Sequence, residues 1–189
     1  MASQYAEAFA RAFESRSGTV SFAATREETS AALRGVARER RASLVAVAGI
    51  PAAVRETVIG ALDGIEVIDV DRLGGALPKE AIAKADLSVT WAAHGVAREG
   101  VLMEATWDDA AKLASCLPLT NVVLVSGERF LPDFASAMRE AGKMVAESPA
   151  PKPTISFIGG SSRTADIEGR LLYGVHGPHS VVALVLEWA

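Results

Sequence analysis

Six residues suited to anion binding follow one another in the last quarter of the sequence: Gly159, Gly160, Ser161, Ser162, Arg163 and Thr164. Glycines allow close backbone approach, and successive N–H groups at the start of a helix attract negative charge. The hydroxyls and the guanidinium add donors for a carboxylate or a phosphate. This stretch therefore predicts a site for a small anion. In the alternative, Ser162 or Thr164 only caps a helix.

Proton-transfer candidates follow a few residues later. His176 lies in a Gly-Val-His-Gly-Pro loop before Gly177 and Pro178, and a loop histidine can move protons near neutral pH. Gly177 is a further candidate for ligand binding. Asp166 can orient His176, which would turn the anion site into a proton-handling site. In the alternative, His176 hydrogen-bonds the backbone of its turn and Asp166 pairs with Arg163. His179 supplies no third metal ligand, so no metal site is predicted.

Alternating helices and strands must position these residues. Short apolar runs predict strands at 44–48, 65–70, 86–91, 101–105, 121–125, 153–158 and 181–186. Helical periodicity and capping signals predict helices at 25–41, 51–62, 79–85, 106–115 and 131–141, with Gly142 as the last C-cap, and a short acidic helix after Gly160. This order predicts a mainly parallel sheet covered by helices on both faces. Two strands without a helix between them, in 86–105, predict an antiparallel part.

The N-terminal segment carries an apolar helical face. Tyr5, Phe9 and Phe13 recur every four residues, which places them on one side of a helix. We expect residues 1–42 to be a helical segment packed on a single α/β domain that spans 1–189. A face that binds a partner helix is the alternative.

Composition limits the function further. The chain has 189 residues, half of them hydrophobic, and a formal net charge of −4. Neither a membrane-length apolar stretch nor a secretion signal is evident, so we expect a cytoplasmic protein without membrane or nucleic-acid partners. The single cysteine, Cys116, excludes an intrachain disulfide and a cluster ligated wholly by cysteines of this chain.

The C-terminal motif resembles a known family. Gly-Ser-Ser-Arg-Thr-Ala-Asp-Ile-Glu at 160–168, followed by Gly-Val-His-Gly-Pro at 174–178, is similar to the signature of the LUD-domain family of LutC/YkgG-type lactate-utilisation proteins. The stretches 85–90, 97–102 and 117–125 match more weakly. Four positions depart from the family pattern: Trp91 replaces a common glycine, Arg98-Glu99 replaces a usual Glu-Thr pair, and Ser161 replaces a common proline.

The resemblance implies a three-layer α/β/α fold similar to the NagB/RpiA/CoA-transferase group, which holds phosphosugars or acyl carriers at the C-terminal edge of its sheet. It also implies a link to oxidation of L-lactate to pyruvate. The chain would then hold no cofactor itself, with iron–sulfur clusters on partner proteins of lactate utilisation. A small anionic metabolite or a redox partner would be its ligand.

A third chemical candidate depends on this fold group, which can carry an acidic residue near a strand opening. Glu99, followed by Gly100, could serve there as a base or nucleophile, with a solvated loop carboxylate as the alternative. Two further functions therefore stay open: an independent phosphosugar-isomerase or CoA-transferase-like enzyme, and a non-catalytic ligand sensor. Whether the chain is catalytic by itself and whether it forms a homo-oligomer also stay open.

Overall fold

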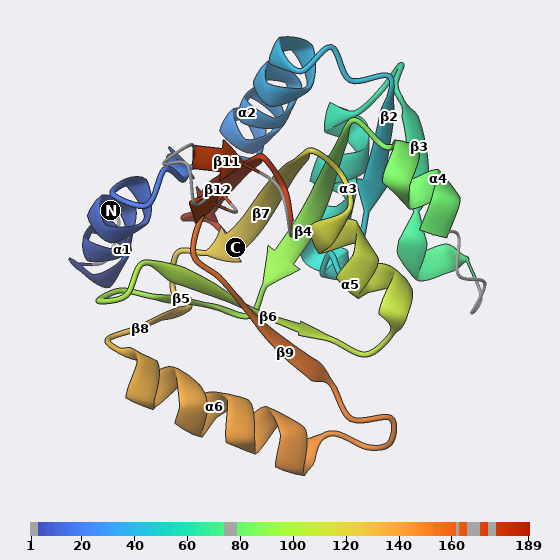
Figure 1. The fold of residues 1–189 in the computed structure, drawn as a ribbon. Coiled ribbons are helices and arrows are strands. Elements are labelled where there is room, and N and C mark those ends of the chain that lie inside the picture. The colour runs from blue at the N-terminus through green and yellow to red at the C-terminus, as the bar shows by residue number, and fades with distance from the viewer. Residues whose placement is uncertain (1–3, 74–78, 162, 166–170, 174–176) are drawn as a thin grey trace.

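Six parallel strands form the central sheet of the computed structural model, which describes residues 4–73, 79–161, 163–165, 171–173 and 177–189 (Figure 1). Their spatial order is β1 (Thr19–Ala23), β12 (Ser180–Leu186), β7 (Thr120–Ser126), β4 (Leu87–Ala92), β2 (Leu44–Val47) and β3 (Glu66–Asp69). Every neighbouring pair in this sheet is parallel. The predicted α/β class and mainly parallel sheet are confirmed.

Helices cover both faces of this sheet. One face carries α2 (Arg26–Glu39) and α3 (Ala52–Ala61); the other carries α1 (Gln4–Glu14), α4 (Lys79–Lys84) and α5 (Asp109–Cys116), and a 3-10 turn, Val70–Arg72, follows β3. Alternate residues of β7 separate the two cores. Val122 packs with α2 and α3, whereas Val123 packs with α1. Because both faces of the strands are buried, they appear in the sequence as continuous apolar runs.

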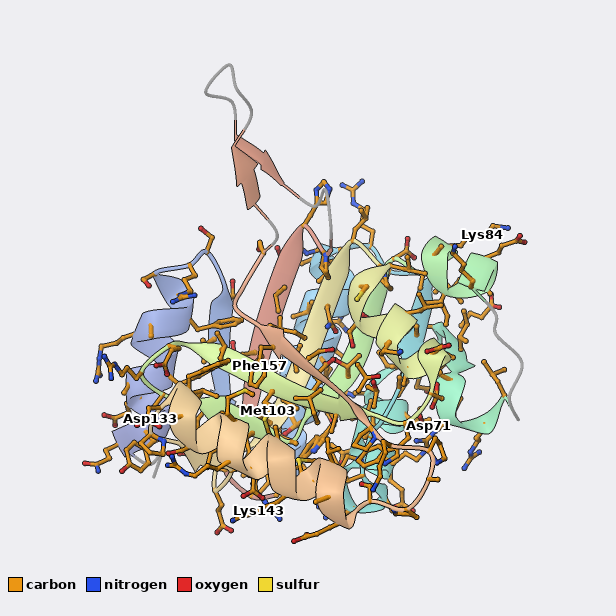
Figure 2. The ribbon with its side chains drawn as sticks, turned by 60° about the horizontal axis from the view of Figure 1, so that its bottom comes forward. Asp71, Lys84, Met103, Asp133, Lys143 and Phe157 are labelled. Carbon is orange, nitrogen blue, oxygen red and sulfur yellow. The ribbon has the colours of Figure 1, made fainter. Side chains whose placement is uncertain are left out.

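A second, smaller sheet lies beyond the C-terminal ends of the parallel strands (Figure 1). It contains β8 (Phe130–Leu131), β5 (His94–Val96), β6 (Val101–Thr106) and β9 (Thr154–Ile158), in that spatial order. Helix α6 (Phe134–Glu147) covers one face of this sheet and lies over Met103 and Phe157 in Figure 2. An antiparallel pair does occur within 86–105, but not between the two predicted strands. The strand predicted at 86–91 is β4, which pairs in parallel within the central sheet, whereas the strand predicted at 101–105 is β6, which pairs with the unpredicted strand β5.

The prediction of a short helix after Gly160 is wrong. Residues 163–165 form β10 (Arg163–Ala165), which pairs antiparallel with β11 (Leu171–Tyr173). Figure 2 shows this pair of strands standing out from the rest of the ribbon. The partner strand satisfies backbone groups that a helix would have bonded internally, and leucine and tyrosine in β11 suit a strand.

The predicted end of the last long helix is also wrong. Helix α6 begins after Asp133, whose side chain accepts a hydrogen bond from the backbone N–H of Ser136 at 2.8 Å, and it continues through Gly142. Beyond that glycine, Met144 packs onto the core of the small sheet. This tertiary contact outweighs the modest cost of a glycine inside a helix.

The N-terminal helix packs on its own domain, as the first alternative predicted. Phe9 and Phe13 are fully buried, with ring centroids 5.1 Å apart, and Phe9 also contacts Phe130. Tyr5 stays partly exposed. Within 1–42, however, the chain also contributes β1 to the edge of the central sheet. No helix in the described part of the chain is long and apolar enough to cross a membrane.

Candidate functional site

A pocket of about 730 Å³ lies where the parallel strands end, between the central sheet and α6. Gly49 follows β2, Trp91 lies near the end of β4, and Ser126 ends β7; Glu140 and Met144 approach from α6. We call this the edge pocket. Open α/β sheets bind ligands outside the carboxyl ends of their strands, and the volume falls within the range of ordinary ligand sites.

His94 is a buried titratable side chain in the lining of the edge pocket. It is only 8% exposed, and its Nδ1 atom makes no hydrogen bond to any described residue. Burial lowers the pKa of His94, and the charge of Arg129 adds to this shift. The charge of Glu140 and a hydrogen bond with the Arg129 backbone oppose it. The imidazole is therefore held mainly in its neutral form at pH 7, in which one ring nitrogen accepts a hydrogen bond.

Among the described residues, the charged side chains that line the edge pocket are one cation and four carboxylates: Arg129, Asp71, Asp108, Glu128 and Glu140. Arg129 lies exposed in the lining, and no carboxylate among the described residues pairs with it. Asp71, in contrast, is fully engaged: it accepts a hydrogen bond from the Gly49 N–H at 2.9 Å and pairs with Arg55 at 2.9 Å. Asp71 thus fixes the loop after β2, while Arg129 can attract an anion.

The remaining lining suits a ligand with an apolar part. Trp91, Trp107 and Met144 line the edge pocket together with small alanines. Thr106 adds a buried hydroxyl that has no hydrogen-bond partner among the described residues. The pocket therefore combines aromatic surface with a few convergent polar groups, as small-molecule sites commonly do.

A second pocket, of about 280 Å³, contains the predicted glycines. Gly159 and Gly160 line it from the end of β9 and Gly177 from the segment before β12, opposite Glu104 and Lys112. We call it the glycine pocket. It lies on the sheet face that carries α1 and α5. The structure thus brings together three of the predicted ligand-binding residues, but around a different centre from the edge pocket.

The neighbouring Ser161 does not line either pocket. Its hydroxyl donates a hydrogen bond to the backbone oxygen of Ser17 at 3.2 Å, and Gly160 packs against Arg16 with a φ of +106°. A side chain at position 160 would lie 2.8 Å from the Arg16 backbone oxygen. Glycine is therefore required for the turn to approach the end of α1.

The other predicted site residues are placed as follows. Arg163 and Thr164 lie in β10, and Ser162, Asp166 and His176 lie outside the described residues, so the predicted orientation of His176 by Asp166 stays a prediction. Glu99 and Gly100 lie between β5 and β6, against α1, and line neither pocket. One carboxylate oxygen of Glu99 is buried without a partner among the described residues.

Three residues that line the pockets were not predicted as site residues from the sequence: His94, Arg129 and Glu104. His94 was not selected as a site residue because nothing local showed that its strand would cross the ends of the parallel strands. Arg129 follows a buried strand at the carboxyl edge, a position that could have identified it. Glu104 interrupts the apolar strand β6, which is itself a signal of a buried carboxyl. Among the described residues, no group of three or more potential ligands could hold a metal ion.

The fold and pockets define a three-layer α/β domain with a ligand-sized pocket at the carboxyl edge of its parallel sheet. The family model of the LUD domain matches residues 6–186, so the chain belongs to the LUD domain family. This confirms the resemblance of the C-terminal motif.

Curated relatives include Lactate utilization protein C from Halalkalibacterium halodurans, 28% identical over 117 residues, and from Anoxybacillus flavithermus, 33% identical over 107 residues. These matches cover 62% and 57% of this chain but 51% and 46% of the relatives, or about half their length. A crystal structure of a DUF162 family protein from Deinococcus radiodurans is similar with a TM-score of 0.65 and 17% identity. It covers 98% of this chain and 99% of that chain, and supports the fold.

Proposed function

We propose that this chain is a LutC-like component of L-lactate oxidation to pyruvate, and that it binds a small anionic metabolite in the edge pocket. Membership of the LUD domain family and the relatives named Lactate utilization protein C support the pathway. The location of the pocket at the carboxyl edge of the sheet supports the site.

The observation that carries the ligand-binding proposal is the unpaired polar surface around His94. A buried acceptor without a partner costs free energy, and this cost is removed when a ligand supplies the missing donor. Arg129 adds a positive charge without a described carboxylate partner. A metabolite with an anionic group near Arg129 and a hydroxyl near His94 would satisfy both groups.

The redox chemistry of such a pathway would be supplied by partner proteins. We propose that iron–sulfur clusters lie on those partners, because Cys116 is the one cysteine that this chain could contribute to a cluster. A redox partner docking across the edge pocket is the alternative ligand. A binding assay distinguishes the metabolite from the redox partner. If the ligand is a metabolite, it binds the purified chain alone. If the ligand is a redox partner, substitutions in the edge pocket change a measured property only when that partner protein is present.

Growth tests the pathway role, and complementation tests the edge pocket. We expect a deletion in the source organism to grow poorly on L-lactate, and the wild-type gene to restore growth. His94→Gln and Arg129→Gln should restore it poorly, whereas Arg139→Gln, an exposed arginine of α6 outside the pocket lining, should behave as wild type. Normal growth of the deletion strain would refute the pathway role. Full complementation by both pocket variants would refute the edge pocket alone.

An independent enzyme acting on a phosphosugar or an acyl carrier is the second candidate. The neutral imidazole of His94 favours it, because such a group can accept a proton from a bound substrate. Glu99 and His176 are the acid–base residues predicted from sequence for this function. A screen of phosphosugars and acyl-CoA compounds by thermal shift tests it: a compound that is turned over by the wild type and not by His94→Gln supports it, and the absence of any shift counts against it.

A further inference from the structure

Glu104 is a buried carboxyl that neither the proposed pathway role nor the edge pocket uses. It lies in β6, is 2% exposed, and lines the glycine pocket. No cation pairs with it among the described residues. Burying an ionised carboxylate without a cation costs free energy. The protonation state of Glu104 therefore determines the charge of the ligand that the pocket can bind.

Four hydrogen-bond contacts define that state. Glu104 Oε2 lies 2.5 Å from the Ser115 hydroxyl, and Oε1 lies 2.6 Å from the Thr90 hydroxyl. The Thr90 hydroxyl also lies 3.2 Å from Asn121 Oδ1, which in turn lies 3.1 Å from the Ser88 hydroxyl. The Asn121 amide group is oriented by the contact of its Nδ2 with the Ser115 carbonyl at 3.4 Å, so Oδ1 is an acceptor.

With the Asn121 amide in this orientation, which its contact with the Ser115 carbonyl assigns, one distribution of protons satisfies all four contacts. Thr90 has a single hydroxyl proton, and Asn121 Oδ1 can only accept. If Thr90 donates to Asn121, the contact of Thr90 with Glu104 needs a proton on the carboxyl. If Glu104 is ionised, one of the two Thr90 contacts brings two acceptors together. A neutral Glu104 therefore completes the network, and burial, which raises the pKa of Glu104, acts in the same direction.

With Glu104 neutral, the pocket has a net positive lining. The charged or titratable groups that line it in the described part of the chain are Glu104 itself, Lys112 and Cys116, all three contributed by β6 and α5. The residues packed around Glu104 from β4, β7 and β9 are uncharged: Ser88, Thr90, Asn121, Ser156, Phe157 and Ile158. Lys112 also forms an ion pair, at 2.6 Å, with the carboxylate of Asp109, which does not line the pocket.

The walls set the size and character of the ligand. Gly159, Gly160 and Gly177 leave one side without side chains, so backbone groups can approach a ligand closely. Ile158 and Val181 give the pocket an apolar surface, because Ile158 lies on the same face of the small sheet as Glu104. A volume of about 280 Å³ suits a molecule of a few heavy atoms and excludes a nucleotide-sized one.

We propose that the glycine pocket is a second binding site, separate from the edge pocket, that takes a small monocarboxylate with a short apolar group. The carboxylate would lie toward Lys112 and the glycine backbone, and the apolar end toward Ile158 and Val181. Glu104 acts as a neutral wall that allows the anion to enter. This site does not depend on a role in lactate oxidation, because acetate, pyruvate and L-lactate share the chemistry that it recognises.

Binding of acetate, pyruvate and L-lactate to the purified chain, measured by amide chemical shifts in NMR titrations, tests the proposal. We expect saturable shifts at Ser115, Gly159 and Gly160. Lys112→Met should weaken binding about fivefold, as for loss of one partly exposed charge contact. The matched control is Lys143→Met. Lys143 lies on α6, away from the glycine pocket, and like Lys112 it pairs with a carboxylate three residues earlier in its helix. This substitution should leave binding unchanged.

The pH dependence of binding tests the role of Glu104. Binding to the wild type should weaken as pH rises through the folded-state pKa of Glu104, because an ionised Glu104 repels the ligand. Glu104→Gln, a neutral side chain of the same shape, should bind at every pH. In infrared difference spectra between the two proteins at pH 7, the wild type should show the C=O band of a carboxylic acid.

Three results would overturn the proposal: no saturable binding of any of the three acids, equal affinity in the wild type and Lys112→Met, or an infrared difference that shows only carboxylate bands. A normal growth phenotype on L-lactate leaves these measurements unaffected, so the failure of the pathway role and the failure of this site can be told apart.

Discussion

The pH dependence of stability should differ between the wild type and Glu104→Gln. Burial raises the pKa of Glu104 above its ordinary value of 4.5, so the folded state holds this proton at a pH at which the unfolded chain has released it. A group with a raised folded-state pKa contributes stability that is fully present below the unfolded pKa. This contribution is lost as pH rises toward the folded pKa.

The slope of that loss follows from linkage. One extra proton bound by the folded state lowers the free energy of unfolding by about 1.4 kcal/mol for each pH unit between the two pKa values. Glu104→Gln cannot titrate, so its stability should decline less steeply by up to this amount per unit. The difference between the two proteins is more reliable than either absolute stability, since the substitution also changes the hydrogen bonds with Ser115 and Thr90.

Urea unfolding of both proteins from about pH 5 to about pH 8 provides the measurement. The range stays below the titration of Cys116, whose pKa is raised chiefly by desolvation. Glu128→Gln, which removes an exposed carboxylate, controls for the change in net charge. Parallel stability curves for the wild type and Glu104→Gln would refute the reasoning, because they would mean that Glu104 gains no proton on folding.

Four further substitutions test the packing and the hydrogen bonding of the fold. Gly100→Ala should lower the free energy of unfolding by about 2 kcal/mol or more, because φ is +57° and the new Cβ would lie 2.5 Å from the backbone of α1. Gly35→Ala, in the open middle of α2, should raise it by about 0.5–1 kcal/mol in the same thermal or urea assay. Phe9→Ala should cost about 3–5 kcal/mol in urea unfolding, whereas a loss below about 1 kcal/mol would show that the α1 face is not core. Asp86→Ala should lower the free energy of unfolding by about 2 kcal/mol at neutral pH. The hydrogen bond from the Ser43 backbone is the main cause that lowers the pKa of Asp86, so the stability advantage of the wild type should shrink as pH falls toward that pKa. A difference in stability that stays constant across acid pH would contradict this assignment.

Local signals identified most of the architecture. The apolar runs that became β2, β4, β7 and β12 were recognisable because strands buried on both faces cannot alternate in polarity. The capping signal at Thr25 and Glu28 was equally local. In the structure the Glu28 N–H donates to the Thr25 hydroxyl at 3.1 Å, and the Ala24 N–H donates to the Glu28 carboxylate at 2.7 Å.

Non-local pairing explains the errors. Residues 163–165 carry helix-start signals, yet their backbone pairs with 171–173, and no feature of a six-residue window reveals a partner strand. The stop signal at Gly142 was likewise overridden by contacts of Met144 with the small sheet. In both cases the outcome depends on elements that fold onto the segment from elsewhere in the chain.

The candidate sites were only partly predictable for the same reason. Gly159, Gly160 and Gly177 could be chosen from sequence because glycine has a local backbone meaning. The partners of Glu104 could not, since Thr90, Ser115 and Asn121 come from β4, α5 and β7. Buried titratable groups acquire their chemistry from neighbours that the fold supplies, so their roles appear only when the strands are placed in register.

The two pockets are linked through consecutive residues of two strands. On β4, Thr90 binds Glu104 beside the glycine pocket, whereas the next residue, Trp91, lines the edge pocket. On β6, Glu104 lines the glycine pocket and Ala105 lines the edge pocket. Because successive side chains of a strand point to opposite faces, a one-residue shift of either strand would disrupt both pockets together. A ligand that displaces β4 or β6 in one pocket must therefore move a wall of the other.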